Sequence, residues 1–489
     1  MSEAGLEYIS IGARLKEIVA AKPGAPAITS QDVTQTWAEL HRRSNRMARG
    51  LLAKGVKQGD YLTIALSNGI EFVETCYACW KIGAVPQPVS SRLPASELAA
   101  IVELAKTPIV VSDTPMAAPA PVVSSGELLA ASADESDLPD AVSPSWKAPT
   151  SGGSTGRPKL IVSGTAGLTA KGGAAQSFWG HTADTVALMP GPLYHNGPFS
   201  NVFAALNAGG HVIVMAKFDA ETTLRDVERH RANWIYLVPT MMSRIWRLPN
   251  REQYDVSSLK TVWHLAAPCP PQLKQHWIDW LGADAIWELY GGTEAQAATT
   301  ISGTEWLTHR GSVGRVMPGG EMKAFDAHGH PLPPGETGEI YMRHDASLPP
   351  TYRYVGAEAR TLHDGWESIG DIGWFDDEGY LYLADRRTDM ILVGGANVYP
   401  AEIEAALDEH PLVASSAVIG LPHEEMGNQV HAIIQGRPGL DLEDLQRHLA
   451  ERLVIYKRPR TFELVDENVR DDAGKVRRTA LRDARVKKG

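Results

Sequence analysis

Hydrophobic positions in the first 110 residues change between helical and strand spacing several times. Apolar residues recur near Leu40, Met47 and Leu51, so a helix is predicted from Trp37 to Gly55. Short apolar runs predict strands at 61–66, 84–86 and 108–111, with helices between them at 72–80 and 95–106. This alternation predicts a mostly parallel sheet covered by helices.

The alternation resumes after residue 158 and then gives way to two other patterns. Further strands are predicted at 186–189, 211–215 and 234–238. From Gly311 to Asp385, short apolar segments between glycine and proline turns predict a small β-rich subdomain. Beyond Thr388, helices are predicted at 401–409 and 442–453 and strands at 413–419 and 431–435. The predicted fold is α/β: a large N-terminal domain of helix-covered, mostly parallel sheets with the β-rich subdomain, and a small mobile α+β C-terminal domain.

Composition narrows the function classes. A chain of 489 residues is long enough for two or more domains, and its net charge of −11 argues against a nucleic-acid partner. Cys76 and Cys79 lie in an apolar helical run and are interpreted as buried small hydrophobes rather than a redox or metal pair. No apolar stretch reaches the roughly 18 residues of a membrane span, so a reduced, cytoplasmic protein is expected.

A glycine- and hydroxyl-rich run extends from Ser151 to Lys159. It follows residues 113–149, whose alanine, proline, serine and aspartate content predicts a surface excursion. Glycines allow consecutive N–H groups to form an anion nest, and Lys159 adds a charge that suits a polyphosphate. The run lacks the Gly-Lys-Ser/Thr ending of a P-loop. Taken alone, a flexible linker explains it equally well.

Two carboxylates follow glycine turns farther along the chain. Thr293 and Glu294 come after a pair of glycines, where the hydroxyl suits a phosphate and the carboxylate suits Mg²⁺. A plain β-turn explains these residues almost as well. Asp371 follows Gly370, and a carboxylate there is able to hold both hydroxyls of a ribose. Three further runs complete the set of motifs: 385–391, 394–404 and 474–478.

These motifs, in this order and at these separations, resemble the adenylate-forming (ANL) superfamily, which includes acyl-CoA synthetases, peptide-synthetase adenylation domains and firefly luciferase. The resemblance covers the chain from the Trp37 helix to Lys475. It implies an acid–thiol ligase that activates a carboxylic acid with ATP as acyl-AMP, releases pyrophosphate and passes the acyl group to a thiol. The implied cofactors and co-substrates are ATP, Mg²⁺ and coenzyme A.

The resemblance also implies a role for each matching residue. Three are implied to be catalytic: Thr293 at the α-phosphate, Glu294 holding the magnesium, and Lys475 reaching the α-phosphate and the substrate carboxylate. Those implied to bind ATP are Ser154, Thr155, Gly156, Lys159, Ala267, Pro268, Glu288, Tyr290, Asp371 and Arg386. Those implied to line the acyl pocket are His195, Gly197, Ala266, Gly291 and Gly292, and those lining the CoA channel are Gly394 and Gly395.

The implied domain organisation is an N-terminal adenylation domain over 1–385, a hinge at 386–388 and a C-terminal domain over 389–489. Thr388 is the expected hinge residue. The positions that depart from the superfamily's usual pattern are Gly152, Ile369, Asp385 and Thr388. They leave open how firmly the loop holds phosphate and where the hinge turns.

The acyl substrate and the acceptor are expected from less specific features. Residues 192–198 offer His195 and Asn196 where amino-acid-activating relatives carry an aspartate, which disfavours an α-amino acid. The residues implied to line the pocket are small, and the sequence runs are similar to those of bile-acid and steroid CoA ligases. Both features predict that the substrate is a bulky polycyclic acid such as a steroid or diterpenoid acid. Fatty and aryl acids stay open.

With no carrier domain after Lys475, free CoA is the expected acceptor, and a carrier-protein phosphopantetheine is the alternative. A nucleotide-binding protein without turnover and a luciferase-like oxidising enzyme are further alternatives from other classes. Whether the chain forms a homodimer is left open.

Overall fold

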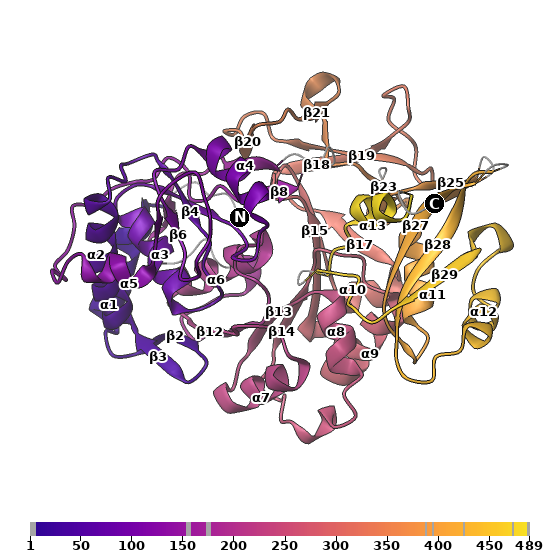
Figure 1. The fold of residues 1–489 in the computed structure, drawn as a ribbon, viewed down its shortest axis with the longest axis horizontal. Coiled ribbons are helices and arrows are strands. Elements are labelled where there is room, and N and C mark those ends of the chain that lie inside the picture. Colours follow the sequence, from indigo (N-terminus) through magenta and orange to yellow (C-terminus); the bar gives the residue numbers. More distant parts are fainter. Residues whose placement is uncertain are drawn as a thin grey trace.

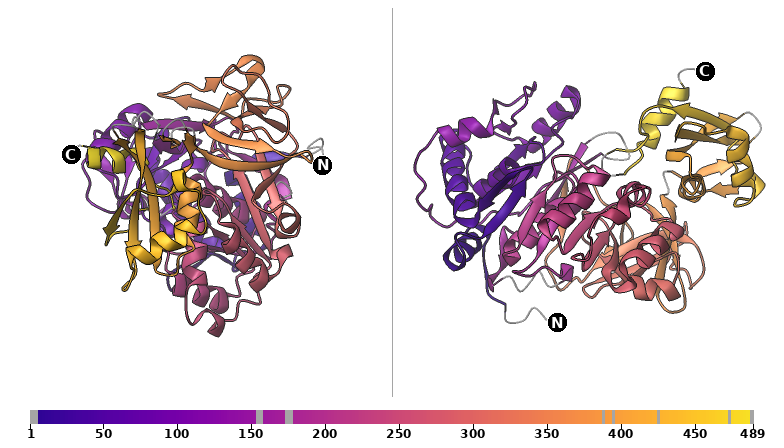
Figure 2. Two further views of the ribbon diagram at one scale, coloured as in Figure 1. Left: turned by 90° about the vertical axis from the view of Figure 1, so that its right-hand side faces the viewer. Right: turned by 90° about the horizontal axis from the view of Figure 1, so that it is seen from below.

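The computed structural model describes residues 6–152, 158–172, 178–386, 389–393, 396–423, 426–471 and 474–486. Within these ranges the chain forms a large N-terminal domain and a small C-terminal domain that lies against one side of it (Figure 1). Seen from below, the C-terminal domain is a separate body (Figure 2). The predicted fold class is confirmed.

One sheet of the N-terminal domain is entirely parallel, with the strand order β5-β4-β6-β7. Its strands are β4 (Tyr61–Ile64), β5 (Val85–Pro88), β6 (Val110–Val111) and β7 (Val122–Val123). The helices of this half are α1 (Ile11–Ala21), α2 (Trp37–Ala53), α3 (Ile70–Lys81), α4 (Ala95–Ala105) and α5 (Ser125–Ala130). The predicted Trp37 helix is α2, and it begins at a capping box in which Thr36 and Glu39 satisfy each other's main-chain N–H groups.

A second sheet contains the parallel strands that position the site, in the order β15-β14-β13-β11-β12-β2. These strands are β2 (Pro26–Ser30), β11 (Val186–Met189), β12 (His211–Val214), β13 (Trp234–Leu237), β14 (Thr261–His264) and β15 (Ile286–Gly291). The antiparallel β3 (Val33–Thr36) forms its edge. The helices of this half are α6 (Asn196–Ala208), α7 (Ala220–His230), α8 (Pro239–Trp246) and α9 (Pro271–Leu281). Most residues of the inner strands are buried, as expected for a parallel sheet covered on both faces.

The predicted β-rich subdomain is an antiparallel continuation of this second sheet. Beyond β15 the strand order is β16-β17-β24-β23-β19-β22-β21, with β18 paired to β19. The bounds are β16 (Ala298–Ser302), α10 (Gly303–Thr308), β17 (Ser312–Val316), β18 (Gly320–Phe325), β19 (Gly338–His344), β21 (Arg360–Thr361), β22 (Glu367–Ser368), β23 (Asp371–Phe375) and β24 (Tyr380–Arg386).

Two small sheets complete the N-terminal domain. One joins β1 (Tyr8–Ser10) to β10 (Leu168–Ala170). The other has the order β20-β9-β8 and consists of β20 (Tyr352–Val355), β9 (Pro158–Ser163) and β8 (Thr150–Gly152). The second of these matters for the site, because β20 lies beside the strand that follows the glycine-rich run.

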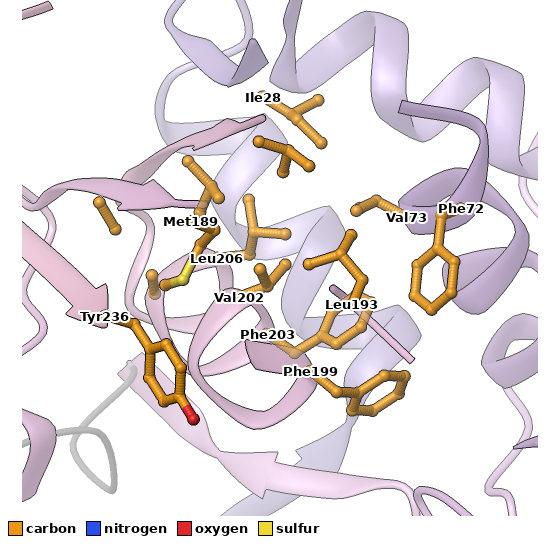
Figure 3. Packing of buried hydrophobic residues seen from close by; sticks show 14 of the residues in the cluster. Ile28, Phe72, Val73, Met189, Leu193, Phe199, Val202, Phe203, Leu206 and Tyr236 are labelled. Atoms are coloured by element: carbon orange, nitrogen blue, oxygen red, sulfur yellow. The ribbon is translucent and has the colours of Figure 1, made fainter. Parts of the chain in front are cut away.

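Helices α3 and α6 fill the layer between the two parallel sheets. Phe72 of α3 meets Phe199 of α6 edge-on with ring centroids 6.3 Å apart, and Trp80 meets Phe203 at 4.6 Å. Figure 3 shows Phe72 of α3 beside Phe199 of α6, with the labelled α6 side chains facing the apolar residues around them. Since α3 contacts strands of both sheets and α6 contacts β11 and β12, the two halves share one core.

The two cysteines of α3, Cys76 and Cys79, are free thiols with no solvent exposure. Burial raises the pKa of both thiols well above its usual value. The prediction that they are buried small hydrophobes is confirmed.

The C-terminal domain has its own sheet, in the order β26-β25-β28-β27 with β29 beside β28. Its elements are β25 (Ile391–Val393), β26 (Ala396–Val398), α11 (Pro400–Asp408), β27 (Val413–His423), β28 (Gly427–Gly436), α12 (Leu442–Ala450), β29 (Thr461–Val465) and α13 (Arg478–Val486). Its buried cluster extends from Ile391 to Leu453 and is separate from the N-terminal core. Arg247, just after α8, donates hydrogen bonds to the main-chain carbonyls of Asp408 and Val413, which ties the two domains together.

Candidate active site

The candidate site is a cleft at the carboxyl ends of β11, β13, β14 and β15. Its volume is about 2400 Å³, and residues of both domains line it. β11 pairs with β12 on one side and with β13 on the other. Successive strands are therefore added first to one side of β11 and then to its opposite side. In open α/β sheets such a switch point leaves a crevice outside the strand ends, where ligands bind.

The end of β15 places Tyr290 in the cleft wall, and the turn after it adds Thr293 and Glu294. β15 and β16 form a hairpin, and Ala295 in its connection has a left-handed φ of 53°. Glu294 is only 7% exposed. The turn thus sets a hydroxyl residue and a buried carboxylate next to each other, as the sequence predicted.

Glu294 shares its carboxylate with two side chains from the small sheet. The Tyr354 hydroxyl donates to Oε1 at 2.5 Å, and the Lys159 ammonium lies 3.7 Å from the same oxygen. Lys159 also lies 3.8 Å from the centre of the Tyr354 ring, a cation–π distance. Burial and the Glu294 charge raise the pKa of Tyr354, so its hydroxyl remains a donor.

Tyr354 is a site residue that the sequence analysis missed. It lies in β20, which contains none of the motifs, and it reaches the cleft because β20 pairs with β9, the strand that carries Lys159. Tyr352, two residues earlier, donates in the same way to Glu367 at 2.5 Å. No signal in the sequence connects these strands, which are far apart along the chain.

Tyr290 and Asp371 are joined directly, since the Tyr290 hydroxyl donates to Asp371 Oδ2 at 2.6 Å. Asp371 begins β23, and β23 pairs with β24 so that Asp371 lies opposite Arg386 in the register. Three residues that the sequence assigned to the adenine and the ribose are therefore neighbours in the fold.

Glu288 takes part in a buried ion pair that the sequence analysis did not predict. Lys274 of α9 has no solvent exposure and donates to Glu288 Oε2 at 2.7 Å. His264 Nε2 lies 3.8 Å from the same oxygen. Burial lowers the pKa of His264 to about 4, so its ring is neutral near pH 7. Glu288 lines the cleft together with Ala267 and Pro268.

Three glycines predicted for the acyl pocket lie against close neighbours. A Cβ added at Gly197 would lie 2.4 Å from Tyr236 Oη, and one at Gly292 would lie 2.7 Å from Glu294 Oε2. At Gly291 the nearest atom, Ala298 Cβ, would be 3.2 Å away. Neighbouring atoms occupy the space beside these glycines, so the glycines leave no extra room for a substrate. They therefore give no support to the prediction that the acid is bulky.

His195 and Ala266 face the same cleft from two strand ends. His195 occupies the N-cap position of α6, and its Nε2 is buried with no hydrogen-bond partner among the described residues. Ala266 follows β14 with a φ of 78°, a left-handed conformation that costs a residue with a Cβ about 1 kcal/mol. Strain of this kind is typical of residues held in place at a binding site.

Lys475 reaches the cleft from the C-terminal domain. The preceding residue, Gly474, packs so closely on Thr240 of α8 that an added Cβ would lie 2.7 Å from Thr240 Oγ1. Burial, together with the positive charge of Lys475, lowers the pKa of His195 to about 4. Lys475 is therefore close to the predicted acyl pocket, although it belongs to a different domain.

Some of the predicted residues lie outside the described ranges: Ser154, Thr155, Gly156, Thr388, Gly394 and Gly395. Their roles stay predictions. Of the departures from the superfamily pattern, Ile369 lines the cleft, and its side chain would lie 3.2 Å from a Cβ at Gly292. An apolar residue thus occupies this position against the glycine turn.

Comparison with known proteins places the chain in the family that the motifs indicated. The family described as AMP-binding enzyme matches residues 15–352, and the AMP-binding enzyme C-terminal domain matches residues 402–475. The chain belongs to this family, the adenylate-forming superfamily, and is an AMP-forming ligase of the acyl-CoA synthetase type that uses ATP.

Two curated relatives and one solved structure illustrate the similarity. The feruloyl-CoA synthase of an Amycolatopsis species is 32% identical over 472 residues, covering 94% of this chain and 96% of the relative. The fatty acid–[acyl-carrier-protein] ligase ScoC of Streptomyces coeruleorubidus is 31% identical and covers 94% of each chain. The o-succinylbenzoate CoA synthetase of Bacillus subtilis, solved with its acyl-adenylate, is 27% identical with a TM-score of 0.82 and covers 97% of this chain and 98% of its own.

None of the helices in the described part of the chain is long and apolar enough to cross a membrane.

Proposed function

We propose that the protein joins a hydrophobic, ring-containing carboxylic acid to the thiol of coenzyme A through an acyl-AMP intermediate. The observation that carries this proposal is the meeting of charges from two domains in one cleft: Lys159 beside Glu294 on one side, and Lys475 near His195 on the other. Positive charge at both ends suits a triphosphate and a carboxylate that have to approach each other.

The adenine and ribose of ATP lie between Tyr290 and the carboxylate of Asp371 in this proposal, with Arg386 on the neighbouring strand. Lys159, together with Ser154, Thr155 and Gly156, holds the β- and γ-phosphates, and Thr293 donates to the α-phosphate. Tyr354 fixes Glu294 at the phosphate end through its 2.5 Å hydrogen bond.

The donor set fits magnesium that arrives with the nucleotide. No group of three or more histidine, cysteine or acidic residues capable of holding a metal occurs among the described residues. Mg²⁺ commonly binds through one or two protein carboxylates plus substrate phosphates, and Glu294 offers such a carboxylate in the cleft. When bound, the ion would offset the negative charge of the phosphate oxygens.

The first half-reaction needs no general base, because a carboxylic acid is already ionised near pH 7. Its oxygen attacks the α-phosphorus of ATP, a P–O bond forms, and pyrophosphate leaves with the bonding electrons. Lys475 brings the two anions together and stabilises the charge that builds up on the α-phosphate oxygens. Thr293 donates to the same oxygens.

The second half-reaction transfers the acyl group from AMP to a thiol. In this proposal residues 386–388 form the hinge between domains at 1–385 and 389–489. The C-terminal domain turns about Thr388, withdraws Lys475 and brings Gly394 and Gly395 to a thiol channel. Hinge closure of this type is an ordinary domain motion.

The nature of the acid is proposed from the walls of the cleft. Residues 192–198 supply no acidic side chain to pair with a substrate ammonium, and Tyr236, 2% exposed, presents an aromatic ring next to Gly197. An aryl acid suits such a wall, and a polycyclic acid such as a steroid or diterpenoid acid remains in the proposed class. A carrier-protein thiol is the second candidate acceptor, because the relative ScoC transfers to an acyl-carrier protein according to its name.

The test is pyrophosphate release with ATP and Mg²⁺ across fatty, aryl, steroid, diterpenoid and amino acids, with and without CoA. Turnover with a ring-containing acid that rises on addition of CoA, together with a thioester product, supports the proposal. Adenylation that CoA does not accelerate favours the carrier-protein acceptor. Release with α-amino acids alone contradicts the acyl-pocket assignment.

A further inference from the structure

One wall of the cleft contains polar side-chain groups that have no hydrogen-bond partner among the described residues. The wall is the start of α6 with the adjoining end of β13, and its side chains are His195, Asn196 and Tyr236, which all line the cleft. We call these three residues the α6 wall. The role inferred for this wall rests on the acyl pocket of the proposed function.

Tyr236 presents an unpaired hydroxyl. The side chain is 2% exposed, and burial alone raises its pKa, with no hydrogen bond contributing. Its phenol oxygen points away from the apolar cluster that surrounds the ring (Figure 3). Gly197 lets this oxygen approach the first turn of α6, since an added Cβ would lie 2.4 Å from it. The hydroxyl is therefore available to donate to a ligand in the cleft.

Asn196 presents an unpaired amide N–H₂ group. Its Oδ1 accepts a hydrogen bond from the ammonium of Lys147, so the oxygen end of the amide is occupied. No described residue accepts a hydrogen bond from Nδ2. Because an ammonium only donates, Lys147 fixes which end of the amide it contacts and leaves the donor end to the cleft.

Lys147 is an unusual residue to find at this place. It is 7% exposed, its ammonium also donates to Ser200 Oγ at 2.7 Å, and it lies 4.0 Å from the centre of the Trp146 ring. Among the described residues it has no carboxylate partner, and burial lowers its pKa to about 7. A buried lysine without a counter-ion is costly to the fold, which indicates a role other than stability.

His195 adds a third group, because its buried Nε2 has no partner among the described residues. The low pKa of this histidine keeps the ring neutral near pH 7, so Nε2 donates or accepts according to the tautomer. The α6 wall therefore offers three polar groups: the Tyr236 hydroxyl on β13, the Asn196 amide N–H₂ at the first residue of α6, and the neutral imidazole nitrogen of the N-cap residue His195.

We infer that the α6 wall is a specificity subsite for an oxygen substituent on the body of the acid: a hydroxyl, ether or carbonyl group remote from the carboxylate. Asn196 and Tyr236 donate to this oxygen, and Lys147 is a positioning residue that holds the Asn196 amide in the donating orientation. A plain hydrocarbon acid displaces water from these donors without replacing its hydrogen bonds and is selected against, because sites built to hydrogen-bond a substrate reject analogues that lack the group.

The test compares acids that differ by one oxygen: cinnamic with 4-hydroxycinnamic acid, 4-methylcinnamic with 4-methoxycinnamic acid, decanoic with 10-hydroxydecanoic acid, and cholanic with 3-hydroxycholanic acid. ATP–pyrophosphate exchange gives kcat/KM for each member of a pair. The expected result for the unmodified protein is a preference of about tenfold or more for the oxygenated acid in at least one pair.

Three variants then examine the wall. Tyr236→Phe removes only the hydroxyl, and Asn196→Asp keeps an oxygen for Lys147 while removing the N–H₂ donor. Both are expected to reduce the preference to about twofold or less. Lys147→Met is expected to reduce the preference as well, with a change in KM for the oxygenated acid that exceeds the change in kcat.

Lys81→Met is the matched control for Lys147→Met. Lys81 is likewise a buried lysine, and its ammonium donates to Ser44 Oγ and Asn45 Oδ1 at 2.8 and 2.6 Å, but it does not line the cleft. Its removal is expected to leave the preference unchanged. Far-ultraviolet circular dichroism and thermal unfolding show whether each variant is folded.

The outcomes separate this inference from the proposed function. If the unmodified protein adenylates both members of every pair equally well, or if Tyr236→Phe and Asn196→Asp keep the full preference, the subsite is wrong and the ligase proposal stands. If no acid of either kind supports exchange with ATP, the proposed function fails and the subsite fails with it.

Discussion

The Tyr354 hydroxyl donates a 2.5 Å hydrogen bond to Oε1 of Glu294, while the Tyr354 ring lies 3.8 Å below the ammonium of Lys159. One tyrosine therefore contacts both the acidic residue proposed for magnesium and the lysine proposed for the phosphates. It joins β20 to the turn after β15 and keeps the two opposite charges 3.7 Å apart.

Replacing Tyr354 tests whether this contact prepares the metal and phosphate end of the site. Tyr354→Phe keeps the ring under Lys159 but removes the donor to Glu294. We expect the Mg²⁺ concentration for half-maximal pyrophosphate release to rise about tenfold, since hydrogen bonds to charged groups contribute about 1.5–3 kcal/mol. The measurement is the initial rate against Mg²⁺ at fixed ATP.

Tyr254→Phe is the matched control, because this tyrosine donates to the carboxylate of Glu221 at the same 2.5 Å and does not line the cleft. It is expected to leave the Mg²⁺ dependence unchanged. Equal Mg²⁺ curves for both variants would show that the Tyr354 hydroxyl does not act through Glu294.

Lys475→Ala tests whether Lys475 acts in adenylation and not in thiol transfer. We expect adenylation to fall by about 10²–10³-fold, the usual effect of losing one well-placed electrostatic contact. Thiol transfer from a synthetic acyl-adenylate should change little, because Lys475 acts before the adenylate exists. Arg447→Ala is the control from the same domain, since its guanidinium pairs with Asp444 of the same helix at 3.2 Å and does not line the cleft. Equal loss in both half-reactions contradicts the assignment.

Arg247→Met tests whether the observed domain arrangement is the adenylating one. The variant removes two donors to main-chain carbonyls of the C-terminal domain. We expect adenylation to fall about tenfold while thiol transfer from preformed adenylate is maintained, since each lost hydrogen bond is worth about 1 kcal/mol. Arg251→Met is the control, because Arg251 bonds to Trp246 and Glu252 within the N-terminal domain. An unchanged ratio of the two half-reactions in Arg247→Met would count against the link.

Lys274→Met tests the buried pair behind Glu288. Removing one partner leaves a carboxylate buried without its counter-ion, which destabilises proteins by about 3–5 kcal/mol. We expect a clear decrease in the unfolding temperature, and partial recovery in the double variant with Glu288→Gln. The measurement is thermal unfolding followed by circular dichroism. If the single variant unfolds at the temperature of the unmodified protein, the pair does not contribute to stability.

Lys147 gives a pH dependence whose sign follows from its pKa of about 7 in the folded chain, below the ordinary value of 10.5. Between these two values the unfolded chain binds more protons, so the free energy of unfolding rises with pH over this window. Below pH 7 both states are protonated and the full penalty of burying the charge is present. Among the residues that the structure describes, the ammonium contacts only the neutral groups of Asn196, Ser200 and Trp146.

Lys147→Met removes this penalty. We expect the variant to be more stable than the unmodified protein at pH 6, on the order of a few kcal/mol, with a smaller difference at pH 10. Denaturant unfolding at the two pH values gives the comparison. A variant that is less stable at pH 6 would show that the hydrogen bonds of Lys147 outweigh its desolvation.

The sequence by itself determined the order of elements and much of the site. Local spacing of apolar residues predicted α2, β4, β11, β12 and β13, because helical and strand periodicities are properties of short segments. Turn residues placed Thr293 and Glu294, and Asp371, at the ends of strands for the same reason. The motif order then indicated the adenylate-forming superfamily, and the family match confirms it.

Only the tertiary structure decided which side chains meet. Tyr354 reaches Glu294 through a strand pairing, and Lys274 reaches Glu288 across a helix and a strand, so neither contact has a local signal. The predicted surface excursion 113–149 ends in a buried lysine, because residues near Lys147 pack beside α6. The glycines expected to leave room are occupied by neighbours such as Tyr236. A sequence pattern specifies what each segment forms, whereas packing between distant segments specifies what faces the substrate.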